Sequence, residues 1–385
     1  MHARAHSQSL RIGIDVRAIS YPKTGDRSYT LGLLDGLARL SERGEIAHEF
    51  VLFFDQQPPA ELPCMREGEL LNGWRTETLN AAHARLWTLF ALPRAARRLG
   101  VDVLHVQYNG PRVRDPALVT TVHDVSFRLF PEWFSLKDRT VLDLGLRSTL
   151  SVARHVFAVS ECTGEDIEQV YGIDRGQISV TYNALPPGFE APGSAEVEGV
   201  LERHGVERPY VLFVGVRQPR KNLPRAIRAF SAVKTRADLP HRLVLVGKRG
   251  WQAGETERAI EAAGDDVQPV GYVPDADLPA LYAGAEVFLF PSLYEGFGIP
   301  VLEAFACGTP VLTSNVSALP EVAGDAAAAV DPRDEDAIAE ALLRVLGDAE
   351  RRAELVARGR ERLREFDWVE TARRTVEGYE RAVSG

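Results

Sequence analysis

The residues whose type and spacing most clearly indicate a chemical role are two glutamates, Glu295 and Glu303, eight positions apart in the segment 291–310. A pair of carboxylates can hydrolyse a glycosidic bond when the two groups flank that bond. Here Glu295 precedes a glycine-rich loop, whereas Glu303 follows it, so the spacing does not describe a hydrolase pair. Carboxylate oxygens also accept hydrogen bonds from hydroxyl groups. The pair therefore indicates a site that binds hydroxyls.

The same segment predicts an anion site. The run Phe288–Phe290 is typical of the end of a buried strand, and Glu295–Gly298 of a flexible loop. Pro300 suits the first position of a helix that Gly308 would close. A glycine-rich loop that leads from a strand into a helix turns unpaired N–H groups and a positive dipole end toward one point, where phosphate binds.

A second strand end supplies cations. The run Tyr210–Gly215 reads as a strand and is followed by Arg217, Arg220 and Lys221. Taken alone, this loop reads as a solvated basic turn. Beside a predicted anion site it indicates phosphate binding, because charge-assisted hydrogen bonds are stronger than neutral ones. Phosphate together with several hydroxyls describes a nucleotide sugar.

Three further loops follow predicted strands. The loop around Val273 offers backbone groups to a base edge, or serves as the cap of the next helix. His123 and Asp124 end another strand, where a neutral imidazole can bond a sugar hydroxyl; a capped turn explains the pair almost as well. Gly25 lies in the first strand-to-helix loop, which has a single glycine and is a poor phosphate loop.

Short strand-like runs alternate with helical patterns along the whole chain. Strands are predicted near residues 12–15, 50–54, 103–107, 119–122, 156–159, 178–181, 210–215, 243–247, 267–272, 287–290 and 311–313. Such alternation predicts parallel sheets covered by helices on both faces, with ligands beyond the carboxyl ends of the strands. The Pro/Gly-rich segment 185–194 marks a break between two α/β domains of similar size, which are expected to face each other across a cleft.

Composition narrows the functional class. The chain has 385 residues, a formal net charge of −9 and three cysteines without metal-ligand spacing. The negative charge argues against nucleic acid as a partner. No apolar run is long enough to span a bilayer and the N-terminus has no secretory signal, so a cytoplasmic location is expected.

One helix-like segment raises the question of membrane contact. Residues 86–98 combine aromatic and aliphatic side chains with Arg94, Arg97 and Arg98. Such a segment can lie on an anionic lipid surface, so peripheral contact with the inner face of a membrane is one interpretation. The other, which the pattern favours, is a core helix with a solvated basic end.

Together these residues resemble the retaining glycosyltransferases of family 4, which have the GT-B fold: two facing Rossmann-like domains with a deep interdomain cleft. The resemblance covers essentially the whole chain and is strongest over residues 211–325. The two-glutamate spacing is its most specific mark. The runs Leu104–Tyr108, Val122–Phe127, Arg220–Asn222 and Ser314–Glu321 are similar to a mannosyltransferase-like subgroup.

The resemblance implies a domain plan. Residues 1–188 would form an acceptor-binding domain and residues 189–205 a linker. Residues 206–365 would bind the nucleotide sugar, and helix 366–385 would pack back on the first domain.

It also implies roles for single residues. Glu303 would bind the ribose hydroxyls, Glu295 and His123 the transferred sugar, and Lys221 with a nearby arginine the diphosphate. The donor-binding set would be Glu303, Gly296, Phe297, Gly298, Arg217, Val273 and Gly25. Where many members of the family have an arginine, this chain has Val216, so Arg217 and Arg220 are both candidates for the diphosphate contact.

The expected activity is transfer of a hexose from a nucleoside diphosphate sugar to a hydroxyl of a glycan, glycolipid or small molecule, with retention of configuration. The subgroup resemblance favours GDP-mannose. No metal or other cofactor is expected, because cations of the protein would stabilise the leaving diphosphate. The alternatives are a UDP-sugar-dependent transferase, a non-catalytic nucleotide-sugar-binding partner of a glycosylation complex, and a phosphorylase or epimerase on the same fold.

Overall fold

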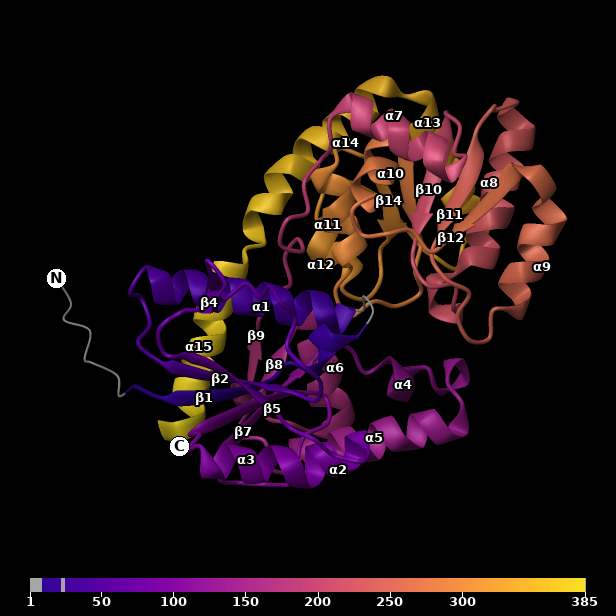
Figure 1. Cartoon of the computed structure of the whole chain (residues 1–385). Coiled ribbons are helices and arrows are strands. Elements are labelled where there is room, and N and C mark those ends of the chain that lie inside the picture. Colours follow the sequence, from indigo (N-terminus) through magenta and orange to yellow (C-terminus); the bar gives the residue numbers. More distant parts are fainter. Residues whose placement is uncertain (1–8, 22–24, 385) are drawn as a thin grey trace. The chain divides into compact units, whose positions relative to one another are not determined.

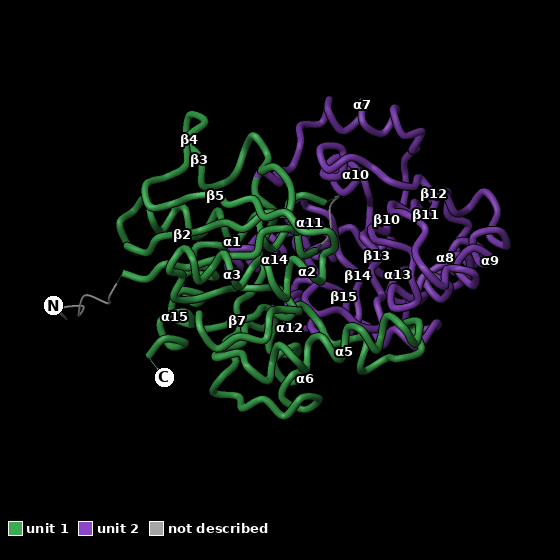
Figure 2. The backbone as a smooth tube through the Cα atoms, turned by 60° about the horizontal axis from the view of Figure 1, so that its bottom comes forward, with its two compact units in different colours: residues 1–187, 367–385 green, residues 188–366 purple. Residues whose placement is uncertain are grey.

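The computed structural model describes residues 9–21 and 25–384 and divides them into two compact units (Figure 1). Unit 1 comprises residues up to Pro187 together with Asp367–Gly385, and unit 2 comprises Gly188–Phe366 (Figure 2). Each unit has its own parallel sheet with helices on both faces. The expected α/β class is confirmed, since every pair of neighbouring strands in the two large sheets is parallel.

The sheet of unit 1 has the strand order β5-β2-β1-β6-β7-β8-β9. Its strands are β1 (Arg11–Asp15), β2 (Glu49–Phe54), β5 (Trp74–Thr78), β6 (Val103–Gln107), β7 (Ala117–Val122), β8 (His155–Ala158) and β9 (Ile178–Val180). A separate two-stranded hairpin pairs β3 (Met65–Arg66) with β4 (Glu69–Leu70). The central strands are almost completely buried, as expected of Val/Ile/Leu-rich strands covered on both faces.

The helices of unit 1 include one from the far end of the chain. They are α1 (Gly25–Glu42), α2 (Ala84–Leu86), η2 (Trp87–Ala91), α3 (Leu92–Arg98), α4 (Ser126–Leu129), α5 (Leu136–Leu150), α6 (Glu161–Tyr171) and α15 (Trp368–Ser384). Short 3₁₀ turns are η1 (Arg17–Ser20), η3 (Pro131–Trp133) and η4 (Arg175–Gln177). Helix α15, yellow in Figure 1, packs on α1 and on the strands β6 to β9.

Close packing of α15 on α1 depends on two glycines. A Cβ added at Gly32 would lie 1.9 Å from Cε2 of Trp368, and one at Gly36 would lie 2.1 Å from the Trp368 carbonyl oxygen. The Trp368 indole N–H donates to the Leu185 carbonyl at 2.7 Å. The C-terminal helix is thus an integral part of unit 1.

The sheet of unit 2 has the order β12-β11-β10-β13-β14-β15. Its strands are β10 (Tyr210–Val214), β11 (Arg242–Val246), β12 (Val267–Gly271), β13 (Val287–Phe290), β14 (Val311–Ser314) and β15 (Ala327–Val330). The order reverses between β10 and β13, which are neighbours in the sheet but not in the sequence. Open α/β sheets bind ligands at such a switch point, beyond the carboxyl ends of the strands.

Helices cover both faces of this sheet. They are α7 (Ser194–His204), α8 (Leu223–Ala237), α9 (Gly254–Ala263), α10 (Leu278–Gly284), α11 (Ile299–Ala306), α12 (Leu319–Ala323), α13 (Glu335–Gly347) and α14 (Ala349–Arg362), with short turns η5 (Pro219–Lys221), η6 (Gly264–Asp266) and η7 (Leu363–Glu365). Helix α7 corrects the expected linker over 189–205. Its buried Val197, Val200 and Leu201 form an apolar face that packs on α10, so residues 194–204 belong to unit 2.

All eleven predicted strands are confirmed, with ends shifted by two residues at most. Two strands of the large sheets were missed, because neither has the apolar β-branched run that marks a buried strand. Strand β5 has the polar sequence Trp-Arg-Thr-Glu-Thr, and β15 is nearly all alanine. Both are edge strands, where partial exposure permits such residues.

Candidate active site

The candidate site of unit 2 is built at the switch point of its sheet. The loop after β10 carries Arg220 and Lys221, and the loop after β13 carries Glu295. The two loops are joined by a backbone hydrogen bond from the Leu293 N–H to the Arg220 carbonyl at 2.8 Å. Residues 75 positions apart in the sequence therefore lie side by side.

Glu295 sits between two cations. Lys221 Nζ donates to one carboxylate oxygen at 2.6 Å, and the Arg220 guanidinium pairs with the other. Burial would raise the pKa of Glu295, but the charges of Arg220 and Lys221 outweigh it and lower that pKa below its usual value. The carboxylate is therefore ionised, and the trio carries one net positive charge.

Lys221 is fixed by its surroundings rather than extended into solvent. Its side chain is 7% exposed, and Nζ lies 4.5 Å from the centre of the Phe290 ring, a cation–π contact. Asn222, with φ of +58°, ties this loop to two others, because its amide donates to the carbonyls of Pro291 (3.0 Å) and Pro332 (2.6 Å). Asparagine tolerates this left-handed conformation better than most residues.

The Glu295 loop is held from the opposite side as well. The Glu295 N–H donates to the Ser317 hydroxyl at 3.0 Å, and the Glu295 carbonyl accepts from the Ala318 N–H. Gly298, at the start of α11, has φ of +116°, and a Cβ there would meet Leu319 Cδ2 at 2.8 Å. Only glycine fits this position, which lets the backbone turn from the loop into the helix.

Glu303 lies one turn into α11 and is 3% exposed. The Tyr282 hydroxyl of helix α10 donates to Glu303 Oε2 at 2.8 Å. Burial and the nearby carboxylate raise the pKa of Tyr282, so the phenol remains protonated and serves as a donor. Sequence reasoning missed Tyr282, although a tyrosine inside an apolar helix next to the site was a signal for a buried hydroxyl.

The other predicted residues of unit 2 are dispersed around this centre. Gly296 and Phe297 are buried between Glu295 and α11, with the Phe297 ring edge-on to Phe366 at 5.6 Å. Val273 is buried in the loop after β12. Arg217 is not brought to Glu295: it faces helix α9, with its Nε 3.5 Å from Glu257. Of the two candidate arginines, Arg220 is therefore the one beside the carboxylate.

In unit 1, His123 directly follows β7 and is 12% exposed. Its Nε2 lies 2.8 Å from Gln107 Oε1 at the end of β6, and the Tyr29 and Tyr108 rings pack on it. Asp124 accepts from the N–H and hydroxyl of Ser126, so the capped-turn interpretation applies to Asp124. Gly25 is exposed at the first residue of α1, and the loop residues 22–24 lie outside the described residues.

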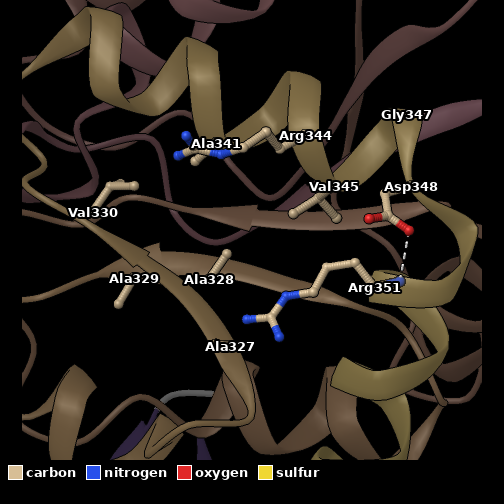
Figure 3. Close-up of a pocket in the computed structure, with 10 residues that line it drawn as sticks. All are labelled: Ala327, Ala328, Ala329, Val330, Ala341, Arg344, Val345, Gly347, Asp348 and Arg351. Atoms are coloured by element: carbon tan, nitrogen blue, oxygen red, sulfur yellow. Dashed lines mark hydrogen bonds between the residues drawn. The ribbon is translucent and has the colours of Figure 1, made fainter.

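Unit 2 also has a pocket that lies away from these residues. A pocket of about 660 Å³ borders the edge strand β15 and the junction of α13 with α14, with Arg344 and Arg351 among its walls (Figure 3). None of the predicted site residues lines it. Within residues 9–21 and 25–384, no cluster of three or more His, Cys, Asp or Glu side chains has the arrangement of a metal site.

Comparisons with known proteins identify the family of the chain. Residues 202–362 match the family model described as Glycosyl transferases group 1, and residues 28–189 match Glycosyltransferase Family 4. The O-antigen chain mannosyltransferase B of Escherichia coli is 33% identical over 383 residues, which cover 96% of this chain and 99% of that protein. The MMP alpha-(1->4)-mannosyltransferase of Mycolicibacterium hassiacum is 32% identical over 60% of this chain and 56% of its own.

Solved structures share the fold. A sucrose-phosphate synthase from Thermosynechococcus elongatus superposes with a TM-score of 0.70 at 21% identity, covering 96% of this chain and 98% of its own. Anabaena Alr3699/HepE in complex with UDP-glucose gives a TM-score of 0.70 at 18% identity over the same shares. The chain is a glycosyltransferase of family 4, with the two Rossmann-like domains of the GT-B fold.

Proposed function

We propose that this enzyme transfers mannose from GDP-mannose to a hydroxyl of a glycan or lipid-linked sugar, with retention of configuration. The proposal is based on the Arg220–Lys221–Glu295 cluster at the switch point of the sheet. Glu295 lies in the loop that leads into the N-terminus of α11. The net positive charge of the cluster suits a diphosphate. The choice of mannose is supported by the names of similar proteins, among them the O-antigen chain mannosyltransferases of Escherichia coli and Salmonella typhimurium.

In this proposal the barrier is cleavage of the anomeric C–O bond, which develops negative charge on the diphosphate. Lys221, Arg220 and the N–H groups of Phe297 and Gly298 stabilise that charge, and their fixed positions make the stabilisation effective. Glu295 holds both cations in place and contacts the sugar. Glu303 binds the ribose, and the diphosphate removes the proton from the acceptor hydroxyl on the same face of the sugar.

The donor can be identified by thermal stability. A ligand at about 100 times its Kd stabilises the folded protein by about 2.7 kcal/mol. We expect GDP to raise the melting temperature more than UDP, ADP or dTDP at equal concentration. A larger shift with UDP would replace the proposed donor by a UDP-sugar, and no shift with any of the four would favour a role other than nucleotide-sugar transfer.

We also propose that catalysis needs no metal ion, because the protein's cations neutralise the diphosphate. Activity with the preferred donor is expected to be unchanged in EDTA. Loss of activity in EDTA, with recovery on adding Mg²⁺ or Mn²⁺, would contradict this.

A surface of unit 1 supports the proposal of a lipid-linked acceptor. Along α2, η2 and α3, Trp87 is buried in the core, whereas Leu86, Leu89 and Phe90 are 43%, 49% and 65% exposed. Residues 78–101 contain four arginines and no acidic residue, although Arg98 pairs with Glu77. Apolar side chains rimmed by cations suit an anionic bilayer surface. No helix among the described residues is long and apolar enough to cross a membrane.

Vesicle flotation tests this contact. The protein is expected to float with vesicles rich in phosphatidylserine and not with phosphatidylcholine alone. The double variant Leu89→Ser, Phe90→Ser should lose flotation, whereas Trp251→Ser, at a residue of unit 2 that is 49% exposed, should keep it. Equal flotation of the two variants would contradict binding of vesicles by this surface.

A further inference from the structure

The pocket beside β15 lies at the free edge of the sheet of unit 2. Among the described strands, β15 pairs only with β14, because it is the last strand in the order of its sheet. All the residues of β15 line the pocket of about 660 Å³, together with residues of α13, of the turn that follows it and of α14 (Figure 3). The edge of the strand therefore opens into a hollow that two helices help to wall.

The register of the β14–β15 pair shows which backbone groups of β15 point away from β14. The Asn315 N–H donates to the Val330 carbonyl at 2.8 Å, so Val330 faces β14. Successive residues of a strand direct their N–H and C=O groups to opposite edges, and Ala328 therefore faces β14 as well. Ala327 and Ala329 present their N–H and C=O groups to the outer edge, where no group in the described part of the chain bonds to them.

Two other edge strands are protected against further pairing, whereas β15 is not. Proline, charged side chains and bulges are the usual means of blocking an edge. Strand β12, at the opposite edge of the same sheet, contains Pro269 and has an irregular register against β11. Strand β5 of unit 1 carries Arg75 and Glu77. Strand β15 has the sequence Ala-Ala-Ala-Val and a regular register, so its edge can accept another strand.

The walls of the pocket carry more positive than negative charge. Arg344 of α13 and Arg351 of α14 reach the pocket from different helices, and Asp348 is the one acidic residue among those that line it (Figure 3). The Asp348 carboxylate is engaged as the cap of α14, because it accepts from the Arg351 backbone N–H at 2.9 Å. The whole chain has a formal net charge of −9, so this hollow differs in sign from the average surface and suits a negatively charged ligand.

Both guanidinium groups are available to a ligand. Arg344 is exposed, and within the described part of the chain it makes no hydrogen bond or ion pair. Arg351 pairs with Glu354 at 2.5 Å, and the two side chains are 38% and 40% exposed. Such exposed pairs contribute little to stability, so Arg351 can exchange this partner at low cost. Glu354 keeps a second partner, Arg358, when Arg351 turns to a ligand.

We propose that β15 binds an extended acidic segment of a partner protein as an added strand, with Arg344 and Arg351 pairing with its carboxylates. The open backbone groups of Ala327 and Ala329 supply the hydrogen bonds, and the arginines select the charge. A second copy of this chain is a poorer partner, because pairing β15 with itself would bring the arginines of both copies together. The site belongs to unit 2 alone and does not depend on the identity of the sugar donor.

Hydrogen exchange followed by mass spectrometry at single-residue resolution tests the added strand. The probe is a short acetylated peptide in which valine and glutamate alternate. We expect it to slow exchange of the Ala329 amide by on the order of 10-fold or more, because this N–H gains a partner. The Ala328 amide already faces β14 and should not change. The same peptide with N-methylated backbone amides cannot complete the ladder and should protect neither residue.

Anisotropy of the fluorescently labelled peptide tests the charge. Arg344→Glu is expected to weaken binding of the glutamate peptide by on the order of 10-fold. Arg360→Glu makes the same change at an exposed residue of α14 outside the pocket and should leave binding unchanged. A peptide with lysine in place of glutamate should bind the wild type more weakly than the glutamate peptide does.

Ala329→Pro tests the backbone contact without changing charge. Proline removes the outward N–H and breaks no hydrogen bond to β14, so the fold should be retained. Binding of the glutamate peptide is expected to be lost in this variant. Circular dichroism and urea unfolding would confirm that the variant is folded, and full binding by a folded Ala329→Pro would contradict strand addition.

Four other outcomes would overturn the proposal. They are the absence of glutamate-peptide binding at about 1 mM, equal binding of the glutamate and lysine peptides, binding without protection of the Ala329 amide, and displacement of the peptide by an equal concentration of inorganic phosphate. The last would identify a site for small anions. A dimer in light scattering that Ala329→Pro dissociates would assign the edge to a second copy of this chain, and this also contradicts the proposal.

Discussion

At the scale of single residues, Lys221 has two roles that can be separated. Removing it leaves a buried carboxylate with one partner fewer, which costs about 3–5 kcal/mol of stability at buried pairs. We expect Lys221→Met to lose stability toward the lower end of that range, because Arg220 still pairs with Glu295. It should also lower kcat/KM by roughly 10²–10³, as the removal of an oxyanion donor does.

The double variant Lys221→Met, Glu295→Gln is the matched control. It removes the uncompensated charge, so the free energy of unfolding from urea titration should recover while activity remains low. Recovery of activity together with stability would mean that Lys221 only supports the fold. Full activity in Lys221→Met would contradict its contact with the diphosphate.

Glu303→Gln tests the proposed ribose contact. The glutamine oxygen can still accept from the Tyr282 hydroxyl, so the fold should be retained. The neutral amide is a weaker acceptor for a ribose diol, and KM for the donor is expected to rise with little change in kcat. Steady-state kinetics at varied donor concentration measure this, and an unchanged KM would remove the assignment.

The limits of the sequence show most clearly at this scale. The residue types and the loops that carry Glu295, Lys221 and Glu303 were predictable, because strand ends and glycine-rich turns have local signatures. Their pairing was not. That Arg220, and not Arg217, meets Glu295 depends on how two loops from non-consecutive strands pack, and Tyr282 reaches Glu303 from a different helix. Such contacts have no local signal.

At the scale of elements, the packing of α15 on α1 leads us to predict that replacing a helical glycine by alanine lowers stability. Alanine is a better helix former than glycine by about 0.8–1.0 kcal/mol. Gly32→Ala is nevertheless expected to destabilise unit 1 by about 1–3 kcal/mol, the usual effect of overpacking, because the new Cβ would overlap the Trp368 ring. Urea unfolding followed by tryptophan fluorescence would measure the loss.

Gly199→Ala is the control within a second helix. Gly199 lies in the middle of α7, and a Cβ there would meet only Arg203 Nη1, at 3.8 Å. This substitution is expected to be neutral or stabilising. If both variants changed stability in the same direction, packing of Trp368 against Gly32 would not be the deciding effect.

At the scale of the whole molecule, the two units are expected to respond differently to acid. In unit 1, burial lowers the pKa of His105 to about 3 and that of His155 to about 4. The unfolded chain binds protons on these rings near pH 6.5, and the folded unit does not. Stability of unit 1 should therefore fall by about 1.4 kcal/mol per pH unit for each ring as the pH drops below about 6.5.

In unit 2 the pKa shifts that affect stability in acid are those of two carboxyl groups, and charged or hydrogen-bonding partners cause them. The pKa of Glu295 is lowered by Arg220 and Lys221 against the effect of burial, and that of Asp277 by hydrogen bonds from His204 and Arg203. Their contribution to stability is complete above about pH 4.3 and is lost as the pH falls through the lowered values. Unit 2 should thus retain its stability to lower pH than unit 1.

Tryptophan fluorescence can distinguish the units, because four of the five tryptophans (Trp74, Trp87, Trp133 and Trp368) belong to unit 1. Urea titrations between about pH 7.5 and about pH 4.5 should show the fluorescence transition moving to lower urea while GDP-induced protection of unit 2 persists. A fluorescence midpoint independent of pH over this range would contradict the role of the buried histidines.

The return of α15 to unit 1 also constrains how the chain acquires its structure on the ribosome. The glycine-lined face of α1 and the Tyr379 partner of His105 depend on residues 367–384, which are made only after all of unit 2. At about 5–20 residues per second, roughly 10–40 s separate synthesis of the first 187 residues from synthesis of their missing helix. During that interval the first-made unit lacks the helix that covers α1 and the strands β6 to β9, and its completion waits for the last-made segment.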